Sequence, residues 1–311
     1  MCGISGFFGN KTIKTKYINS TLRLMRNRGP DFQDYYKENL TKKKNLYLLN
    51  SRLSIIDIKD RSDQPFKIDN LVMTYNGEIY NYLELKKRIS KKVKFKTNSD
   101  TEVILQYYKL YGAKCFEFFE GMWSLAIYDK KNQSLILSRD RFGEKPLYYH
   151  KIKNGFYFAS EIKFIKKLFF KKKFSINYKK ITDFLHFGHR AVCLDNKTFF
   201  KNIYNLEPGT YLKISKNLKI SKHRYWEKLK NKEIKTNFKS IINKSNKLLD
   251  RTIRMQLRAD VPIALLLSGG IDSSFLATKI QKYYKKKIST FSIYDSRDKT
   301  YDERDNINII L

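Results

Sequence analysis

The chain opens with a short apolar run, Cys2-Gly3-Ile4-Ser5-Gly6-Phe7-Phe8, directly after Met1. Residues 4–8 form a short apolar stretch of the kind found in β-strands. Similar apolar or alternating runs follow at residues 46–49, 71–75, 123–128, 134–138 and 155–159, and turn residues bound several of them. Apolar residues at helical spacing predict helices over 17–26 and 100–111. Strands with segregated helices predict a layered α+β domain over residues 2–215.

The pattern changes after about residue 225, where a polar stretch predicts a linker over residues 216–237. A helix is expected from about residue 238 to 257, and the apolar run Ile263-Ala264-Leu265-Leu266-Leu267 is typical of a buried parallel strand. This run breaks at Ser268-Gly269-Gly270, a helix follows, and residues 287–293 are a second strand candidate. Such a strand–loop–helix–strand unit predicts an α/β domain over 238–311. With about 75 residues, we expect that domain to be incomplete, as in a truncated, frameshifted or fragmentary chain.

Composition excludes several classes of protein. With 41% hydrophobic and 15% aromatic residues in 311, wholesale disorder is excluded. No apolar run approaches the roughly 20 residues that cross a bilayer, and the amino terminus has no basic segment leading into an apolar one. The three widely spaced cysteines (Cys2, Cys115 and Cys193) cannot build a disulfide framework. We therefore expect a cytoplasmic protein.

The net charge of +34 would suit a protein that binds nucleic acid. However, the basic residues are spread from end to end, whereas a dedicated polyanion site should be localised. Lys, Asn, Ile, Tyr and Phe are all abundant, which an AT-rich coding sequence would produce. The charge favours a generic solvated surface, and a nucleic-acid-binding protein remains the alternative of another class.

Single residues leave several interpretations open. If Met1 is removed, Cys2 carries both a thiol and a free α-amine that can act as the base for that thiol. Position alone favours a small, buried, unreactive cysteine. Asn76-Gly77 between two apolar runs predicts a hairpin turn, and Asp100 fits the cap or first turn of its helix. His186 and His189 lack a third ligand, so no metal site is predicted.

The loop after the second apolar strand is the other informative stretch. Ser268-Gly269-Gly270-Ile271-Asp272-Ser273 places glycines before the start of a helix, where free backbone N–H groups favour an anion. It is not a Walker A loop, because the required Gly-x-x-x-x-Gly-Lys-Ser/Thr pattern is absent. A plain glycine turn with a helix cap is the structural alternative.

Several sequence blocks occur in a fixed order along the first region. They are Cys2-Gly3-Ile4-Ser5-Gly6, Arg28-Gly29-Pro30-Asp31, Arg52-Leu53-Ser54-Ile55-Ile56-Asp57, Asn76-Gly77-Glu78-Ile79-Tyr80-Asn81, Ser99-Asp100-Thr101-Glu102, Arg139-Asp140-Arg141-Phe142-Gly143 with Lys145-Pro146-Leu147-Tyr148-Tyr149, and Phe158-Ala159-Ser160-Glu161-Ile162-Lys163. Together they resemble the class II glutamine amidotransferase half of glutamine-hydrolysing asparagine synthetases. One departure is Asn27, where that family commonly has His.

The resemblance implies a fold and a set of roles for the first region. The fold is the four-layer αββα arrangement of amino-terminal-nucleophile enzymes. Cys2 would attack the glutamine side-chain carbonyl, and the Asn76 side chain with the Gly77 backbone N–H would form the oxyanion hole. Arg52 would hold the α-carboxylate of glutamine. Asp100, with Glu78 beside it, would bind the α-ammonium.

The second loop resembles the pyrophosphate loop of ATP pyrophosphatases. The resemblance implies an ATP site of Leu267, Ser268, Gly269, Gly270, Asp272, Ser273 and Ile293, with ATP and magnesium bound as a substrate complex and no tightly bound cofactor. The expected reaction converts aspartate, glutamine and ATP to asparagine, glutamate, AMP and pyrophosphate. The alternative within the family amidates a sugar carboxylate in surface-polysaccharide synthesis, and the acceptor pocket that would decide is not in the chain. Glutamine, aspartate and ATP are the expected partners, and a homodimer is possible on this reading, with no membrane and no nucleic acid.

Overall fold

The computed structural model describes residues 1–41, 43–170, 174–193, 195–227, 237–284, 287–293 and 302–311. The chain forms two compact units, Met1–Leu229 and Lys230–Leu311, which are described separately. Among the described residues, no helix is both long and apolar enough to span a membrane.

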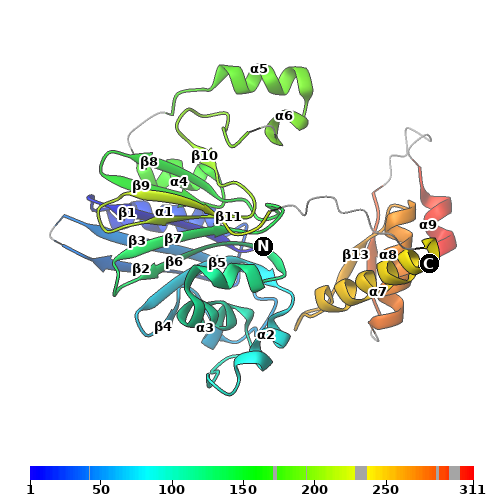
Figure 1. The fold of residues 1–311 in the computed structure, drawn as a ribbon. Coiled ribbons are helices and arrows are strands. Elements are labelled where there is room, and N and C mark those ends of the chain that lie inside the picture. Colours follow the sequence, from blue (N-terminus) through cyan, green and yellow to red (C-terminus); the bar gives the residue numbers. More distant parts are fainter. Residues whose placement is uncertain (42, 171–173, 194, 228–236, 285–286, 294–301) are drawn as a thin grey trace. The chain divides into compact units, whose positions relative to one another are not determined.

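The first unit contains two six-stranded sheets (Figure 1). The first sheet has the order β10-β8-β9-β1-β3-β2, and the second has the order β12-β11-β7-β6-β5-β4. Every pairing between these strands is antiparallel. The strands are β1 (Gly3–Gly9), β2 (Phe32–Asn39), β3 (Asn45–Arg52), β4 (Phe66–Ile68), β5 (Leu71–Ile79), β6 (Gly121–Asp129), β7 (Ser134–Arg139), β8 (Tyr148–Ile152), β9 (Gly155–Ala159), β10 (Tyr204–Asn205), β11 (Thr210–Ile214) and β12 (Ile220–Arg224).

Helices cover the outer face of each sheet. They are α1 (Thr15–Met25) and α4 (Ile162–Phe169) on the first sheet, and α2 (Tyr82–Ile89), α3 (Asp100–Tyr111) and the 3-10 segment η2 (Gly112–Phe118) on the second. A short 3-10 turn, η1 (Asp60–Ser62), precedes β4. Helices α5 (Tyr178–Phe187) and α6 (Arg190–Cys193) lie in the segment that connects α4 to β10.

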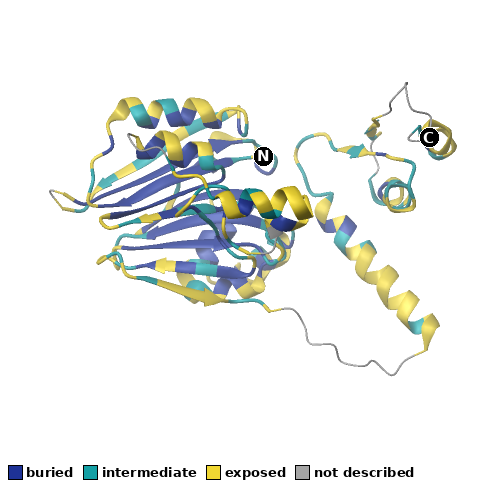
Figure 2. Ribbon diagram, turned by 90° about the horizontal axis from the view of Figure 1, so that it is seen from above, coloured by how far each residue is buried: buried dark blue, intermediate teal, exposed yellow. Residues whose placement is uncertain are grey.

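Alternation along the strands builds three hydrophobic cores. Neighbouring residues of a strand point to opposite faces of a sheet, so Tyr47 packs against α1 and α4 while Leu46 and Leu48 pack against the other sheet. In the same way, Val72 of β5 faces the first sheet and Met73 faces α3. The central strands, such as β1, β3, β7 and β9, are therefore buried on both faces (Figure 2). This arrangement confirms the predicted four-layer αββα fold.

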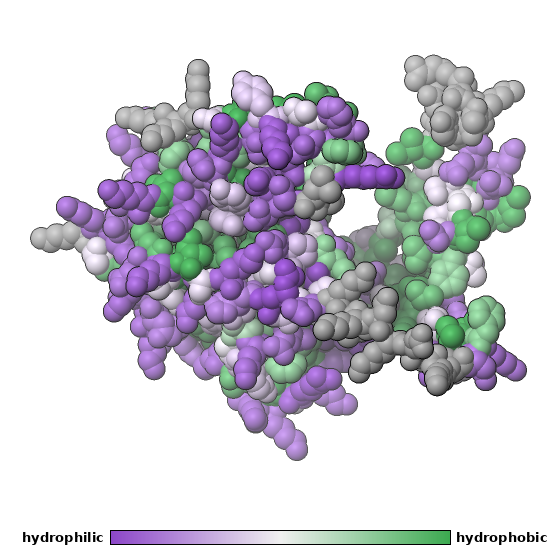
Figure 3. Space-filling model, turned by 45° about the horizontal axis from the view of Figure 1, so that its top comes forward, coloured by the Kyte–Doolittle hydropathy of each residue, from purple (hydrophilic) through white to green (hydrophobic). Residues whose placement is uncertain are grey.

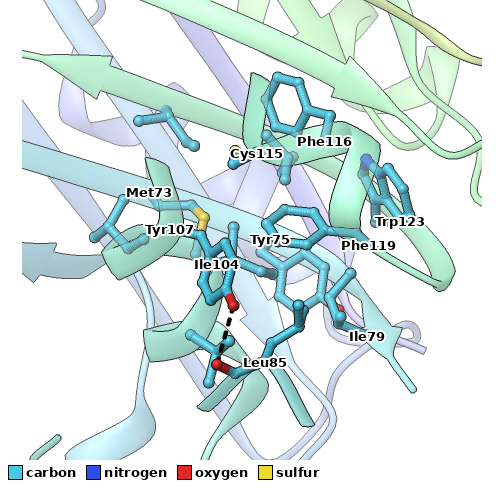
Figure 4. Close-up of a cluster of buried hydrophobic side chains, with 14 of the residues drawn as sticks. Met73, Tyr75, Ile79, Leu85, Ile104, Tyr107, Cys115, Phe116, Phe119 and Trp123 are labelled. Atoms are coloured by element: carbon cyan, nitrogen blue, oxygen red, sulfur yellow. Dashed lines mark hydrogen bonds between the residues drawn. The ribbon is translucent and has the colours of Figure 1, made fainter. Parts of the chain in front are cut away.

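The core beneath α3 is rich in aromatic residues (Figure 4). Phe116, Phe119 and Trp123 pack edge to face, with ring centroids 6.2 Å and 5.8 Å apart for successive pairs. The hydroxyl of Tyr107 donates a hydrogen bond to the Leu85 carbonyl at 3.0 Å, which links α3 to α2. This core fixes the position of α3, whose first residue reaches the functional pocket.

Sequence patterns located the most buried strands and two helices of the first unit, and missed helices α2 and α4 and strands such as β2, β8, β11 and β12. The predicted strands at 4–8, 46–49, 71–75, 123–128, 134–138 and 155–159 and the helices at 17–26 and 100–111 are all present. Strand β2 was not predicted, because its polar sequence is stabilised by pairing with β3 rather than by an apolar face. The predicted linker 216–237 overlaps β12, which pairs with β11; its residues 228–236 lie outside the described part.

The second unit contains α7 (Phe238–Gln256), β13 (Ala264–Leu266), α8 (Ile271–Tyr283), β14 (Ser289–Phe291) and α9 (Arg304–Ile310). Strands β13 and β14 pair in parallel, as the strand–loop–helix–strand pattern predicts. The prediction that the first strand is buried is wrong, since Leu266 is 77% exposed. A parallel strand is buried when helices cover both faces, and this sheet has two strands with hydrophobic side chains left on the surface (Figure 3).

Candidate active site

A pocket opens in the first unit where the start of β1 meets the end of β3, the second half of β5 and the start of α3. It contains every residue predicted for glutamine hydrolysis, and these residues come from four separate sequence blocks. The lining residues are Met1, Cys2, Arg52, Leu53, Ile55, Ile56, Gln64, Tyr75, Asn76, Gly77, Glu78, Ser99, Asp100, Thr101, Met122 and Lys145.

The Cys2 thiol lies against the end of β3. Its sulfur accepts a hydrogen bond from the Leu53 backbone N–H at 3.3 Å. Burial raises the pKa of this thiol, and the Leu53 hydrogen bond opposes that change. The resting side chain is therefore a neutral thiol at neutral pH, and a base is needed to turn it into a nucleophile.

Other sequence blocks hold the backbone of Cys2. Arg28 donates a hydrogen bond from Nε to the Cys2 carbonyl at 2.9 Å, and its guanidinium forms an ion pair with Glu161 at 3.2 Å. Ser160 bonds both backbone groups of Ile4, through its Oγ at 3.1 Å and its N–H at 2.9 Å. The blocks at 28–31 and 158–163 thus fix where β1 begins.

Gly77 presents its backbone N–H to the pocket. Along β5, the N–H of Tyr75 donates to Gln64 Oε1 at 2.7 Å and the N–H of Ile79 donates to Asp100 Oδ2 at 2.9 Å. Backbone direction repeats every second residue of a strand, so the Gly77 N–H between them points the same way, toward the pocket. On its other side, Gly77 pairs with Trp123 of β6. The Trp123 N–H donates to the Asp140 carboxylate, and the Trp123 carbonyl accepts the Asp140 N–H.

Gly77 also has to be glycine. A Cβ at this position would lie 2.1 Å from the Met122 carbonyl oxygen and 2.7 Å from the Trp123 Cα. Both are backbone atoms of β6, which cannot move aside without breaking the ladder. Asn76 and Gly77 are interior residues of β5, so the hairpin-turn interpretation is wrong: residues on the distant β6 pair with them.

The side chain of Asn76 is buried at 1% exposure and lines the pocket. Neither its Oδ1 nor its Nδ2 has a hydrogen-bond partner among the described residues. Buried amides are nearly always hydrogen-bonded, so the unmatched donor indicates a group kept for a ligand. Asn76 and Gly77 both line the pocket, so each offers it one donor.

Two carboxylates, those of Glu78 and Asp100, also line the pocket. Asp100 accepts hydrogen bonds from the Tyr75 hydroxyl and the Ile79 N–H at 2.9 Å each, and burial still raises its pKa. Its helix is capped by the preceding Ser99, whose side chain accepts the Thr101 N–H. Burial first, and then Asp100, raise the pKa of Glu78 to about 7. A cationic group placed here would be held by both carboxylates.

Arg52 ends β3 with its side chain buried. One terminal nitrogen bonds Asp63 Oδ1 at 2.7 Å and the Lys59 carbonyl at 3.1 Å. The other bonds the carbonyls of Ile56 and Asp57 at 3.4 Å and 2.5 Å. Arg52 lines the pocket as expected, and its guanidinium also organises the loop that follows β3.

Sequence analysis assigned no role to several residues that complete the pocket. Gln64 receives the Tyr75 N–H and the Asn50 Nδ2 amide, which holds the open edge of β5 in place. Lys145 lines the pocket with its ammonium buried. Lys145 belongs to one of the recognised sequence blocks, and that position could have predicted a role for it. Nothing in the local sequence around Gln64 predicts its role.

The glycine loop of the second unit connects the carboxyl end of β13 to α8 and contacts the residues that follow β14. Leu267 donates its N–H to the Phe291 carbonyl at 2.9 Å and accepts the Ser292 hydroxyl at 2.6 Å, which places Leu267 near the position of Ile293. Ser268 and Ser273 share a hydrogen bond of 3.1 Å across the loop. Gly269 has φ of +79°, a conformation that favours glycine.

The remaining predicted residues of this loop, Gly270, Asp272 and Ser273, form the cap and first turn of α8. Ile293 is 95% exposed. In the described part of the chain, no three His, Cys, Asp or Glu side chains are grouped to hold a metal ion. His186 lies on the exposed surface of α5, with Nδ1 2.9 Å from the Thr182 carbonyl.

Comparison with known proteins identifies the class of protein that has this fold and pocket. Residues 1–226 match the model of the glutamine amidotransferase domain, and the chain belongs to that family. Residues 244–311 match the asparagine synthase model.

Several curated proteins are similar to this chain over nearly its whole length. The chain is 34% identical over its whole length to a Methanocaldococcus jannaschii protein provisionally named asparagine synthetase [glutamine-hydrolyzing] 2, and it spans 62% of that protein. It is 30% identical to asparagine synthetase 1 of Bacillus subtilis (94% of this chain, 46% of the relative) and to asparagine synthetase B of Escherichia coli (93% and 46%). The chain thus spans about half to three-fifths of their length.

Solved structures with the same fold include the glutamine phosphoribosylpyrophosphate amidotransferase of Bacillus subtilis. It superposes with a TM-score of 0.51 at 16% identity, covering 96% of this chain and 68% of that one. At this identity the likeness supports the fold alone.

Proposed function

We propose that the first unit hydrolyses glutamine at Cys2. The Cys2 sulfur forms a bond to the side-chain carbonyl carbon, and the thiol proton passes to the α-amine that removal of Met1 would free. The carbon–nitrogen bond then breaks, the amine returns the proton to the leaving nitrogen, and ammonia departs. Water hydrolyses the resulting thioester to glutamate and restores the thiol.

The observation that carries this proposal is the buried Asn76 amide, which has no hydrogen-bond partner among the described residues and lines the same pocket as Cys2. The N–H of the next residue, Gly77, lies on the pocket edge of β5 and supplies a second donor. Charge develops on the carbonyl oxygen when the thiol attacks, and a single well-aimed donor to such an oxyanion contributes roughly 2.7–4 kcal/mol. Neighbouring groups suit the rest of glutamine. Arg52 would bind the α-carboxylate, and Glu78 with Asp100 would bind the α-ammonium.

For the second unit we propose ATP-dependent activation of a carboxylate, with aspartate as the acceptor and asparagine as the product. The loop at 268–273 leads into α8, a helix of 13 residues whose first backbone N–H groups have no partner within the helix and favour an anion. ATP with magnesium would bind there as substrate, against Leu267 and Ile293. The relatives named asparagine synthetase support aspartate over a sugar carboxylate. The cytoplasmic location and the homodimer stay predictions of the sequence.

The test is release of glutamate and ammonia from glutamine by the purified chain after mass spectrometry has verified loss of Met1. Cys2→Ala should abolish release and leave the circular dichroism spectrum unchanged. Cys115→Ala is the matched control, because Cys115 is buried in the core beneath α3 and lies outside the pocket. Glutamate release by Cys2→Ala at the wild-type rate would refute the mechanism. Adding ATP, magnesium and aspartate then tests for asparagine.

A further inference from the structure

One recognised sequence block has no role in the mechanism above. It is the loop of residues 139–145 between β7 and β8, which is folded around the carboxylate of Asp140. Oδ1 accepts the N–H groups of Phe142 and Glu144 at 3.0 Å each. Oδ2 accepts those of Lys145 at 3.0 Å and Trp123 at 3.2 Å. Four backbone donors on one buried carboxylate hold the loop firmly against β6.

Arg139 holds the same loop from the other side. Its Nε donates to the Lys145 carbonyl at 2.8 Å and one terminal nitrogen donates to the Leu206 carbonyl at 2.7 Å. The other terminal nitrogen bonds the Gly143 carbonyl. Both backbone groups of Lys145 are therefore fixed by side chains of its own loop, which leaves its side chain with a defined direction.

That side chain delivers a positive charge to the pocket. Lys145 is 5% exposed, and its Nζ lies 3.2 Å from the sulfur of Met1. A thioether is a weak acceptor, and no ion pair holds this ammonium within the part of the chain that the structure describes. By contrast, Arg28 nearby is neutralised by Glu161 at 3.2 Å. An unpaired buried charge is costly, so its retention points to a role.

We propose that Lys145 is a positioning residue of the glutamine-hydrolysing site, which holds a fixed positive charge beside the amino terminus so that the freed amine of Cys2 stays uncharged and accepts the thiol proton. This inference rests on the proposed function. A cation close to an amine disfavours its protonation and favours a nearby thiolate. Both effects promote transfer of the proton from sulfur to nitrogen.

The charges around the terminus agree with this role. In the chain that still carries Met1, burial lowers the pKa of the Met1 amine most. Cys2 and Asp31 raise that pKa, and the charges of Arg28 and Lys145 lower it. The amine freed on Cys2 would lie one residue further along the chain, in the pocket that Lys145 also lines. Lys145 itself faces Glu78 of β5 and the adjacent Glu144, which favour its charged form although burial lowers its pKa. Arg52 and Asp100 act on the thiol in opposite directions.

The test compares Lys145→Met, which keeps the length of the side chain without the charge, with Lys145→Arg. Glutaminase kcat/KM is measured against pH on the full chain with Met1 removed, because its acid limb reports the base of the free enzyme. We expect Lys145→Met to move that limb to higher pH by about one unit and to lower the rate at pH 7 about tenfold, since one pKa unit is a tenfold change. Lys145→Arg should keep the limb of the wild type.

A second measurement does not depend on turnover. The pH dependence of Cys2 alkylation by iodoacetamide, with Cys2→Ala as the background, should shift upward in Lys145→Met. Lys145→Gln is a second uncharged variant and should behave alike. An acid limb and an alkylation profile that stay in place in both variants would overturn the inference, even with a lower kcat. If wild type and Cys2→Ala instead release glutamate equally, the proposed function itself fails.

Discussion

The carboxylate of Asp100 receives the backbone N–H of Ile79 at 2.9 Å, so the first residue of α3 is tied to the last residue of β5. This hydrogen bond satisfies one donor on the open edge of β5, and Gln64 satisfies that of Tyr75. The donor between them, on Gly77, points into the pocket. Helix α3 thus places the Asp100 carboxylate where the α-ammonium of a substrate would bind. The same hydrogen bond fixes the edge of β5 that presents the Gly77 N–H to the other end of the substrate.

Replacing Asn76 by alanine should affect activity and stability in opposite directions. Loss of one oxyanion donor should lower kcat about 10²–10³-fold. The free energy of unfolding should be unchanged or higher, since an unsatisfied buried amide costs about 1–3 kcal/mol. Glutaminase assays and urea unfolding measure the two effects. Asn50→Ala is the matched control and should destabilise, because the Asn50 amide bonds Thr74 at 3.0 Å. An Asn76→Ala protein with wild-type kcat would contradict the oxyanion role.

Gly77→Ala should damage both the site and the fold. The added methyl would sit 2.1 Å from the Met122 carbonyl, so β5 must separate from β6 locally. We expect a drop in thermal unfolding temperature of several degrees, from a loss on the order of 1–3 kcal/mol by overpacking, and near-complete loss of glutaminase. Calorimetry and the glutamate assay measure these. Unchanged stability would show that the strand relaxes more easily than its contacts indicate.

Glutamine binding should weaken as the pH falls below about 7. The pKa of Glu78 is raised to about 7, so its carboxyl becomes neutral there and loses its attraction for an ammonium. We expect KM for glutamine to rise between pH 8 and pH 6 in the wild type. In Glu78→Gln, KM should be higher and independent of pH over this range, and a pH-dependent KM equal to that of the wild type would exclude Glu78 from binding.

The same group predicts a pH effect on folding. Because the folded-state pKa of Glu78 lies above the usual carboxyl value near 4.5, its contribution favours the folded state below that value and is lost as the pH rises through about 7. Glu78→Gln should therefore be stabilised relative to wild type at pH 8, and the difference should shrink toward pH 5. Urea unfolding at several pH values measures it, and a difference that grows toward pH 5 would have the wrong sign.

Arg52→Ala should raise KM for glutamine and also destabilise the protein, because the guanidinium holds the loop after β3 as well as lining the pocket. Asp63→Asn separates the two effects. This substitution removes the ion pair at 2.7 Å and leaves the guanidinium of Arg52 in the pocket. We therefore expect the free energy of unfolding to fall by about 1–3 kcal/mol. KM for glutamine should change less than threefold. If Asp63→Asn raised KM as much as Arg52→Ala, Arg52 would act mainly through the loop.

The sequence was informative wherever local chemistry decides the structure. Strands such as β3 and β6 have apolar central runs because both of their faces are covered, and α3 begins at Asp100 because Ser99 caps it. The half-exposed β2 and β12 were missed, since distant partner strands stabilise them. The loop at 139–145 was recognised as a block, but its bonds to Trp123 and Leu206 lie outside any local pattern.

The amino-acid sequence by itself determined the candidate nucleophile Cys2, the layered class of fold and the glycine loop after the second-unit strand. Tertiary structure decided that Asn76-Gly77 is the interior of a strand, that the Gly77 N–H is aimed into a pocket, and that Lys145 reaches the amino terminus. The physical reason is the range of the interactions. Side-chain alternation and helix caps act over a few residues, whereas the direction of a donor depends on which distant strand satisfies its neighbours.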